Sequence, residues 1–132
     1  MKKSRTPISL TVHGTPEPQA RPRYGSGHFF SPKTVWWHKV QFAARLNRPK
    51  PALEGPVHLI LSFYMPRPKS APQSIVWHRT RPDIDNLAKA VMDAMTTAGW
   101  WLDDGQVAVL EASKQYIAEG EKTSVLITAS EI

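Results

Sequence analysis

Apolar and polar residues alternate with two different periods along this chain, and the shorter period marks the strands. Residues 8–12 (ISLTV) alternate apolar and polar, which predicts a strand with one buried face. Residues 57–65 (VHLILSFYM) are largely apolar on both faces, which is typical of a central strand. Residues 106–116 and 122–129 indicate two further strands, and we expect them to pair as an antiparallel hairpin around the sequence IAEGE.

Two segments have a helical pattern. Ser31 followed by Pro32 resembles a helix start, and the composition stays helical as far as the proline at position 49. The second predicted helix begins near Asp83 and ends before Gly99, a residue suited to the left-handed position after a helix. At ~100° per residue, its apolar side chains fall within an arc of roughly 120°; they are Ile84, Leu87, Ala88, Val91, Ala94, Met95 and Ala98. The elements together predict an α+β fold, with a mixed β-sheet packed by two helices in a single domain over residues 1–132.

Two proline-rich segments, 15–32 and 66–82, interrupt these elements and carry basic and aromatic side chains. Within the first, RYGSGHFF is expected to form a small hairpin that turns at Gly25, Ser26 and Gly27. A loop as long as 66–82 in a compact domain tends to be functional or mobile. Both segments are therefore candidate binding surfaces.

Positive charge is concentrated in the first part of the chain. Residues 1–81 hold 14 Lys and Arg against two acids, whereas residues 82–132 hold three against nine. Such a surplus suits a polyanionic partner, because each neutralised phosphate releases condensed counterions. On charge alone, solubilisation of a small domain is the alternative explanation. The predicted phosphate contacts are Arg21, Arg23, Lys33, Arg67, Lys69, Arg79 and Arg81.

Composition argues against several other kinds of site. The chain has no cysteine, and its five histidines lack ligand-like spacing, so we expect no zinc. No apolar run approaches the ~18 residues of a membrane span, and the start, MKKSRT, leads into no signal-peptide region. We therefore expect a cytoplasmic protein without a membrane partner.

Four carboxylates lie close together in the sequence of this otherwise basic chain. Asp83 and Asp85 open the second predicted helix, and Asp103 and Asp104 follow it in a tight turn. We expect the turn to fold back, so that the four acids meet near the start of that helix. Close carboxylates repel one another unless a cation neutralises them, and Mg²⁺ takes oxygen ligands of this kind. Lys89, one turn from Asp85, is placed to orient water or to stabilise charge on a phosphate.

A structural explanation of the same residues stays open. Asp83 or Asp85 would cap the first turn of the helix, and Lys89 would pair with Asp85 and Asp93 at i,i+4 spacing. The protein would then be a non-catalytic basic DNA-binding or architectural module. Phosphatases and glycosyltransferases also use an Asp-x-Asp pair, but here the pair follows the basic loop WHRTRP and not a buried strand, and the chain is short.

Aromatic residues add two further expectations. Phe29 and Phe30 lie among basic residues and are candidates for a wedge into DNA, with packing inside the hairpin as the alternative. Trp100 and Trp101 directly follow an apolar helix, and we expect them in the core or in a dimer interface rather than stacked on bases.

The sequence RPDIDNLAKAVMDAM, followed by AGWWLDDGQV, closely resembles the RusA family of Holliday-junction resolvases. The shared pattern is basic-Pro-Asp-x-Asp-Asn-Leu-x-Lys, then an aspartate inside the helix, then Gly-aromatic-x-x-Asp-Asp-x-Gln-Val, over residues 81–107 without a gap. The segment RPRY…FFSPKT is similar to the family's N-terminal region more weakly. The loop TPEPQARPRYGSGHFF differs from the asparagine-rich loop of the best-known branch, so a cut-site preference does not carry over.

The resemblance implies roles for the acidic residues. Asp83, Asp85 and Asp104 would serve catalysis and Mg²⁺ binding, with Asp103 as an accessory metal ligand. Lys89 would be the catalytic lysine. Asp93 is expected to order Lys89 or a neighbouring subunit instead of binding metal. The family also implies a homodimer that binds four-way junction DNA and nicks two strands symmetrically in recombination and repair.

Overall fold

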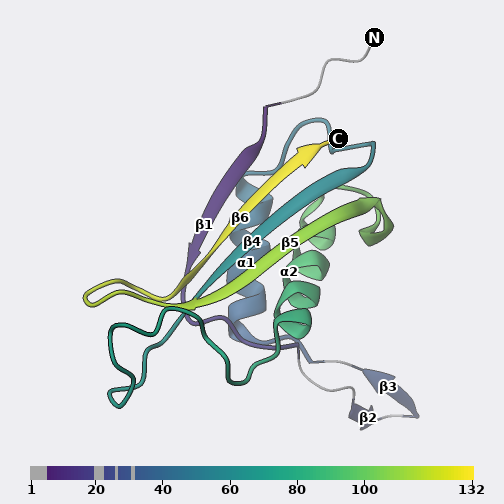
Figure 1. Cartoon of the computed structure of the whole chain (residues 1–132). Coiled ribbons are helices and arrows are strands. Elements are labelled where there is room, and N and C mark those ends of the chain that lie inside the picture. Colours follow the sequence, from purple (N-terminus) through teal and green to yellow (C-terminus); the bar gives the residue numbers. More distant parts are fainter. Residues whose placement is uncertain (1–5, 20–22, 26, 31) are drawn as a thin grey trace.

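In the computed structural model, which describes residues 6–19, 23–25, 27–30 and 32–132, four strands form one mixed sheet (Figure 1). The strands are β1 (Ile8–His13), β4 (Val57–Met65), β5 (Val107–Tyr116) and β6 (Ser124–Glu131), in the order β1-β6-β4-β5. Neighbours β1 and β6, and β6 and β4, are antiparallel, whereas β4 and β5 are parallel. Strand β4 is therefore central, as its two apolar faces predict.

Strands β5 and β6 do not pair with each other, so the predicted antiparallel hairpin is wrong. Each of them pairs with β4, which lies between them. The turn after β5, with Gly120 in the left-handed region at φ 82°, carries the chain past the end of β4. A parallel β4–β5 pair requires a crossover connection, and the segment containing the second helix supplies it.

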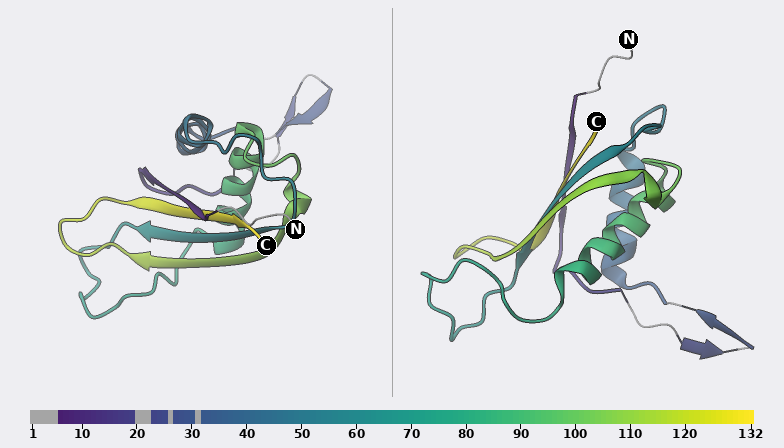
Figure 2. Two further views of the ribbon diagram at one scale, coloured as in Figure 1. Left: turned by 90° about the horizontal axis from the view of Figure 1, so that it is seen from above. Right: turned by 45° about the vertical axis from the view of Figure 1, so that its right-hand side comes forward.

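Helices α1 (Val35–Leu46) and α2 (Ile84–Ala98) lie side by side on one face of the sheet (Figure 2). Helix α1 begins later than the expected start, because the hydroxyl of Thr34 accepts a hydrogen bond from the backbone N–H of Trp37 at 3.0 Å and caps the helix. Ser31, the predicted cap, lies outside the described residues. Helix α2 ends as predicted at Gly99, which has φ 89°.

The core between the helices and the sheet contains most of the predicted stripe of α2. Its buried members are Leu87, Ala88, Val91, Ala94, Met95 and Ala98. Ala90 is buried as well, because α1 packs against the flank of α2 and widens the covered arc. Trp100 and Trp101 are 0% and 1% exposed, which confirms their place in the core.

Two loops project from the end of the sheet near the start of α2 (Figure 1). The small hairpin is present, formed by β2 (Arg23–Gly25) and β3 (His28–Phe30). The long loop 66–82 returns along β5, where the backbone N–H of Tyr116 donates to the carbonyl of Val76 at 2.8 Å. Within the described residues, no helix has the length and apolar character needed to cross a membrane.

Candidate functional site

Asp83 is the N-cap residue of α2 by its backbone and not by its side chain. Its φ and ψ of −70° and 143° are extended, and its carbonyl accepts from the N–H of Leu87 at 3.2 Å. Its carboxylate makes no capping hydrogen bond and is exposed to solvent. Asp83 therefore does not cap the helix with its side chain, contrary to the structural explanation. Its exposed carboxylate lies at the positive end of the helix dipole.

A cleft of about 400 Å³ lies beside this helix start. It brings together Arg81 and Asp83, two of the residues that the sequence singles out, with the amide of Asn86 one turn further along. The remaining lining residues are Pro18, Gln19 and Pro82. Asn86 was not among the predicted site residues, although the sequence signal was present, because it belongs to the DIDN motif. The cleft combines an acid, a base and an amide at a helix N-terminus, which suits a polar or phosphorylated ligand.

Asp85 and Lys89 are both exposed and lie one turn apart on α2. Neither forms an ion pair with another residue in the part of the chain that the structure describes. The expected i,i+4 ion pairs of Lys89 with Asp85 and Asp93 are therefore not formed. Both side chains are exposed, and their catalytic roles stay predictions.

Asp103 and Asp104 lie in the turn that leads to β5, where η1 (Asp104–Gln106) forms a single 3₁₀ turn. Asp103 caps this turn, because its carboxylate accepts from the N–H of Gly105 at 3.1 Å, while the Gln106 side chain accepts from the N–H of Asp103 at 3.2 Å. Asp103 therefore has a structural role in the described chain.

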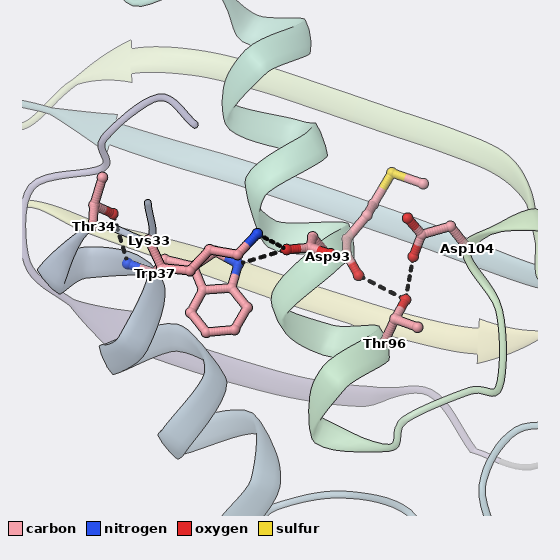
Figure 3. Close-up of polar contacts among 7 residues, drawn as sticks. Lys33, Thr34, Trp37, Asp93, Thr96 and Asp104 are labelled. Atoms are coloured by element: carbon pink, nitrogen blue, oxygen red, sulfur yellow. Dashed lines mark hydrogen bonds and ion pairs between the residues drawn. The ribbon is translucent and has the colours of Figure 1, made fainter. Parts of the chain in front are cut away.

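The Asp104 carboxylate is held from α2. It accepts a hydrogen bond from the hydroxyl of Thr96 (Figure 3). The hydroxyl oxygen of Thr96 in turn accepts from the indole N–H of Trp101 at 2.6 Å. Thr96 carried no signal in the sequence, since threonine near a helix end has many ordinary roles. It nevertheless fixes where one predicted catalytic acid points.

The expectation that all four acids meet near the start of α2 is wrong for a single chain. Asp104 lies beside Thr96 in the last turns of the helix, whereas Asp85 lies in the first turn. At ~1.5 Å of rise per residue, the eleven positions from Asp85 to Thr96 correspond to roughly 16 Å. Among the described residues, no three His, Asp or Glu side chains are grouped so that they could hold one metal ion. The carboxylates are the right ligand type for Mg²⁺, but one chain separates them into two pairs.

Asp93, on the third turn of α2, does not contact Lys89. Its Oδ2 accepts from the ammonium of Lys33 at 2.7 Å and from the indole N–H of Trp37 at 3.1 Å (Figure 3). The ammonium also lies 5.1 Å from the centre of the Trp37 ring. Asp93 thus orders Lys33, which corrects the expectation that it orders Lys89.

The predicted phosphate contacts separate into groups. Arg79 is exposed in the loop before α2, and Arg81 lies in the cleft with Asp83. Arg67 and Lys69 line a separate depression of about 240 Å³ against the turn that contains Gly120. Arg21 lies outside the described residues, as do the side chains of Arg23, Phe29 and Phe30, whose backbones form β2 and β3.

Arg67 is used largely inside the protein. Its guanidinium donates to the carbonyls of Ile117, Pro72 and Ile75 at 3.1, 2.8 and 2.7 Å. It also lies 5.1 Å from the centre of the Tyr116 ring. This arginine closes the long loop onto β5, so any phosphate contact has to come from its remaining N–H groups.

Lys114 on β5 supports the segment that precedes Asp83. Its ammonium donates to the carbonyls of Thr80 and Pro82, both at 2.7 Å. Nearby, His78 is 9% exposed and its ring packs edge-on against Tyr116. Burial, and secondarily the charge of Lys114, lower the pKa of His78 below its ordinary value. Lys114 therefore fixes the segment that precedes Asp83, and the lowered pKa favours the neutral form of His78.

Comparison with known proteins gives concordant matches. The model of the family described as "Endodeoxyribonuclease RusA" matches residues 13–128. The chain is 34% identical over 136 residues to "Uncharacterized protein YqaN" of Bacillus subtilis, a match that covers 91% of this chain and 94% of that protein. It is 46% identical over 50 residues to "Crossover junction endodeoxyribonuclease RusA" of Escherichia coli strain K12 and to the protein of that name in Enterobacteria phage 82. These two matches cover 38% of this chain and 42% of each named nuclease.

Proposed function

The chain belongs to the endodeoxyribonuclease RusA family, and from this membership we propose that it resolves Holliday junctions by paired symmetric nicks, in a Mg²⁺-dependent reaction that serves recombination and repair in the cytoplasm. The single observation that supports this most directly is the exposed Asp83 carboxylate, which shares a cleft with Arg81 and Asn86. An arginine is suited to hold a phosphate of the DNA backbone beside the acid. The cleft borders the start of α2, and both basic loops project at that end of the molecule (Figure 1).

Mg²⁺ fits the chemistry of the acids but not their placement in one chain. When bound, such an ion supplies charge neutralisation at the phosphate and a more acidic water molecule. Asp83 and Asp85 stand at one end of α2, and Asp104 stands at the other. The separation of roughly 16 Å estimated from the helix rise is several times the spacing of two ligands on one ion.

A homodimer would remove this difficulty. Around a two-fold axis perpendicular to α2, the start of the helix in one copy faces its end in the other. Asp83 and Asp85 of one copy would then approach Asp104 of the second copy, and the dimer would hold two equivalent sites. A four-way junction is itself two-fold symmetric and needs two cuts, so the symmetry of the protein and that of the DNA agree.

The first test is cleavage of a fixed four-way junction and of a linear duplex by the wild type and by Asp83→Asn, with Mg²⁺ and with EDTA. We expect paired symmetric nicks in the junction from the wild type with Mg²⁺ alone, and junction binding without cleavage from the variant. Junction binding by both proteins without any cleavage would replace the nuclease with a DNA-binding module.

The shared site is tested separately by mixing two inactive variants, Asp83→Asn and Asp104→Asn. If each site takes acids from two copies, a mixed dimer contains one site with both acids changed and one intact site. We expect the mixture to nick one strand of the junction, whereas each variant alone is inactive. If each chain held a complete site of its own, mixing would restore nothing.

A further inference from the structure

The segment that leaves the small hairpin is tied to α2 by one carboxylate. Lys33 stands three residues after β3, and its ammonium contacts Asp93 Oδ2 at 2.7 Å. Trp37, on the first turn of α1, donates to the same oxygen at 3.1 Å, and the ammonium lies 5.1 Å from its ring centre (Figure 3). We call these three side chains the clasp. The Lys33 and Asp93 side chains are 31% and 35% exposed, so the pair is partly shielded from water.

The segment that enters the hairpin borders the cleft at the start of α2. Pro18 and Gln19 line the cleft together with Asp83 and Asn86 at the first turn of the helix. The segment before the hairpin therefore borders the cleft at the first turn of α2, and the segment after it is bonded to α2 at Asp93. The β2–β3 hairpin itself projects beyond the body of the protein near the start of α2 (Figure 2).

We propose that Asp93 is a positioning residue for recognition of branched DNA. Through Lys33 and Trp37 it sets the direction in which the β2–β3 hairpin projects from α2, and so the preference of the protein for a four-way junction over a linear duplex. The inference rests on the proposed function, since it assigns a selectivity device to that activity. The hairpin carries basic and aromatic residues, and a fixed direction lets them meet the centre of a junction without first being ordered.

A net-charge effect and the loss of the clasp lead to different expectations for the Asp93→Asn variant. Asp93→Asn removes one negative charge from a DNA-binding protein, so simple electrostatics predicts tighter binding to every DNA. The clasp predicts weaker selectivity instead, because an amide does not hold the ammonium of Lys33 as a carboxylate does. The amide oxygen still accepts from the indole N–H of Trp37, so the variant keeps the hydrogen bond that joins α1 to α2.

The experiment measures affinity for a fixed four-way junction and for a linear duplex by fluorescence anisotropy, without metal ions, for Asp93→Asn, Lys33→Met and the double variant. We expect each single variant to lower the ratio of junction to duplex affinity about fivefold to tenfold, and the double variant to lower it no further, since both remove one contact. An unchanged ratio in Asp93→Asn, or additive losses in the double variant, would overturn the proposal.

Two matched variants separate the clasp from net charge. Lys39→Met removes an exposed positive charge from α1, and Glu119→Gln removes an exposed negative charge from the turn after β5. We expect both to shift junction and duplex affinities together and to leave the ratio within about twofold of the wild type. If the wild type bound the junction and the duplex with equal affinity, the proposed function would be wrong. If both the wild type and Asp93→Asn preferred the junction to the same extent, only the proposed role of the clasp would be wrong.

Discussion

Thr96, in the last turns of α2, donates a hydrogen bond to the carboxylate of Asp104, eight residues further along the chain. The hydroxyl has one proton, and the carbonyl of Met92 is a second acceptor at 2.8 Å. An ionised carboxylate is the stronger acceptor, so the proton is expected to point to Asp104. The indole N–H of the buried Trp101 donates to the hydroxyl oxygen and fixes its position. The helix and the core thereby orient an acid that lies on an otherwise exposed turn.

Thr96→Val is expected to lower junction cleavage about tenfold to a hundredfold, the range seen when a group that orients a metal-binding carboxylate is lost. It also leaves the indole N–H of Trp101 without a partner, which costs about 1–3 kcal/mol of stability. Cleavage assays and thermal unfolding measure the two effects independently.

The chain offers two controls for this prediction. Thr97→Val changes the exposed neighbour on the same turn and is expected to leave cleavage at the wild-type level. Thr96→Ser keeps the hydroxyl and is expected to retain most of the activity. Equal activity in the Thr96→Val and Thr97→Val variants would show that the orientation of Asp104 does not depend on Thr96.

Residues 81–107 were enough to predict the family, which the match over residues 13–128 confirms. The helices and strands could also be predicted from the sequence, because burial imposes a period of two residues on strands and of 3.6 residues on helices. The strand partners of β5 and β6 could not be predicted, because an alternating pattern identifies a strand but does not determine which strands pair with it. Both strands pair with β4, which lies between them.

The separation of the acids could have been foreseen from the sequence, whereas the contacts of Asp93 and Lys114 could not. A predicted helix from Asp83 to Gly99 has a fixed length, and a short turn after it cannot return Asp104 to its start. Lys33 lies 60 residues from Asp93, and Lys114 lies 32 residues from Pro82. No local spacing rule connects positions so far apart, and only the packing of α1, α2 and β5 brings them together.

Lys114→Met is expected to lower cleavage about tenfold through the segment that leads into Asp83. The variant loses the hydrogen bonds to the carbonyls of Thr80 and Pro82, each worth about 1.5–3 kcal/mol when the donor is charged. Lys114→Arg keeps donors for both carbonyls and should recover part of the activity. Lys122→Met, an equal charge loss at an exposed turn position, serves as the control. A loss of the same size in Lys122→Met would assign the effect to charge and not to the position of the segment.

Arg67→Met is expected to open the long loop. The variant loses its contact with the Tyr116 ring and three hydrogen bonds from the charged guanidinium, each worth about 1.5–3 kcal/mol. Limited proteolysis should cut the loop faster in this variant than in Lys69→Met, which removes the same charge from an exposed site in the same loop. Identical cutting patterns would mean that other contacts close the loop.

His78 is expected to make the stability of the protein depend on pH below about 6.5, the value at which an unfolded histidine takes up a proton. Burial is the main reason that the pKa of His78 is lowered in the folded protein, and the positive charge of Lys114 is the second. As the pH falls below about 6.5, the unfolded chain binds a proton before the folded one does, so the free energy of unfolding decreases. At higher pH both states are neutral at this position, and the contribution to the slope disappears.

Replacing His78 with Phe removes the titrating group and keeps a ring against Tyr116, which packs edge-on at 5.1 Å in the wild type. Urea unfolding of both proteins between about pH 5 and 8 should show a shallower pH dependence for His78→Phe. His13→Phe, at an exposed position on β1, should keep the wild-type slope. Lys114→Met should make the decline smaller and end it at a higher pH, because removing the nearby positive charge brings the pKa of folded His78 closer to that of the unfolded chain. A slope in His78→Phe as steep as that of the wild type would assign the pH dependence to other groups.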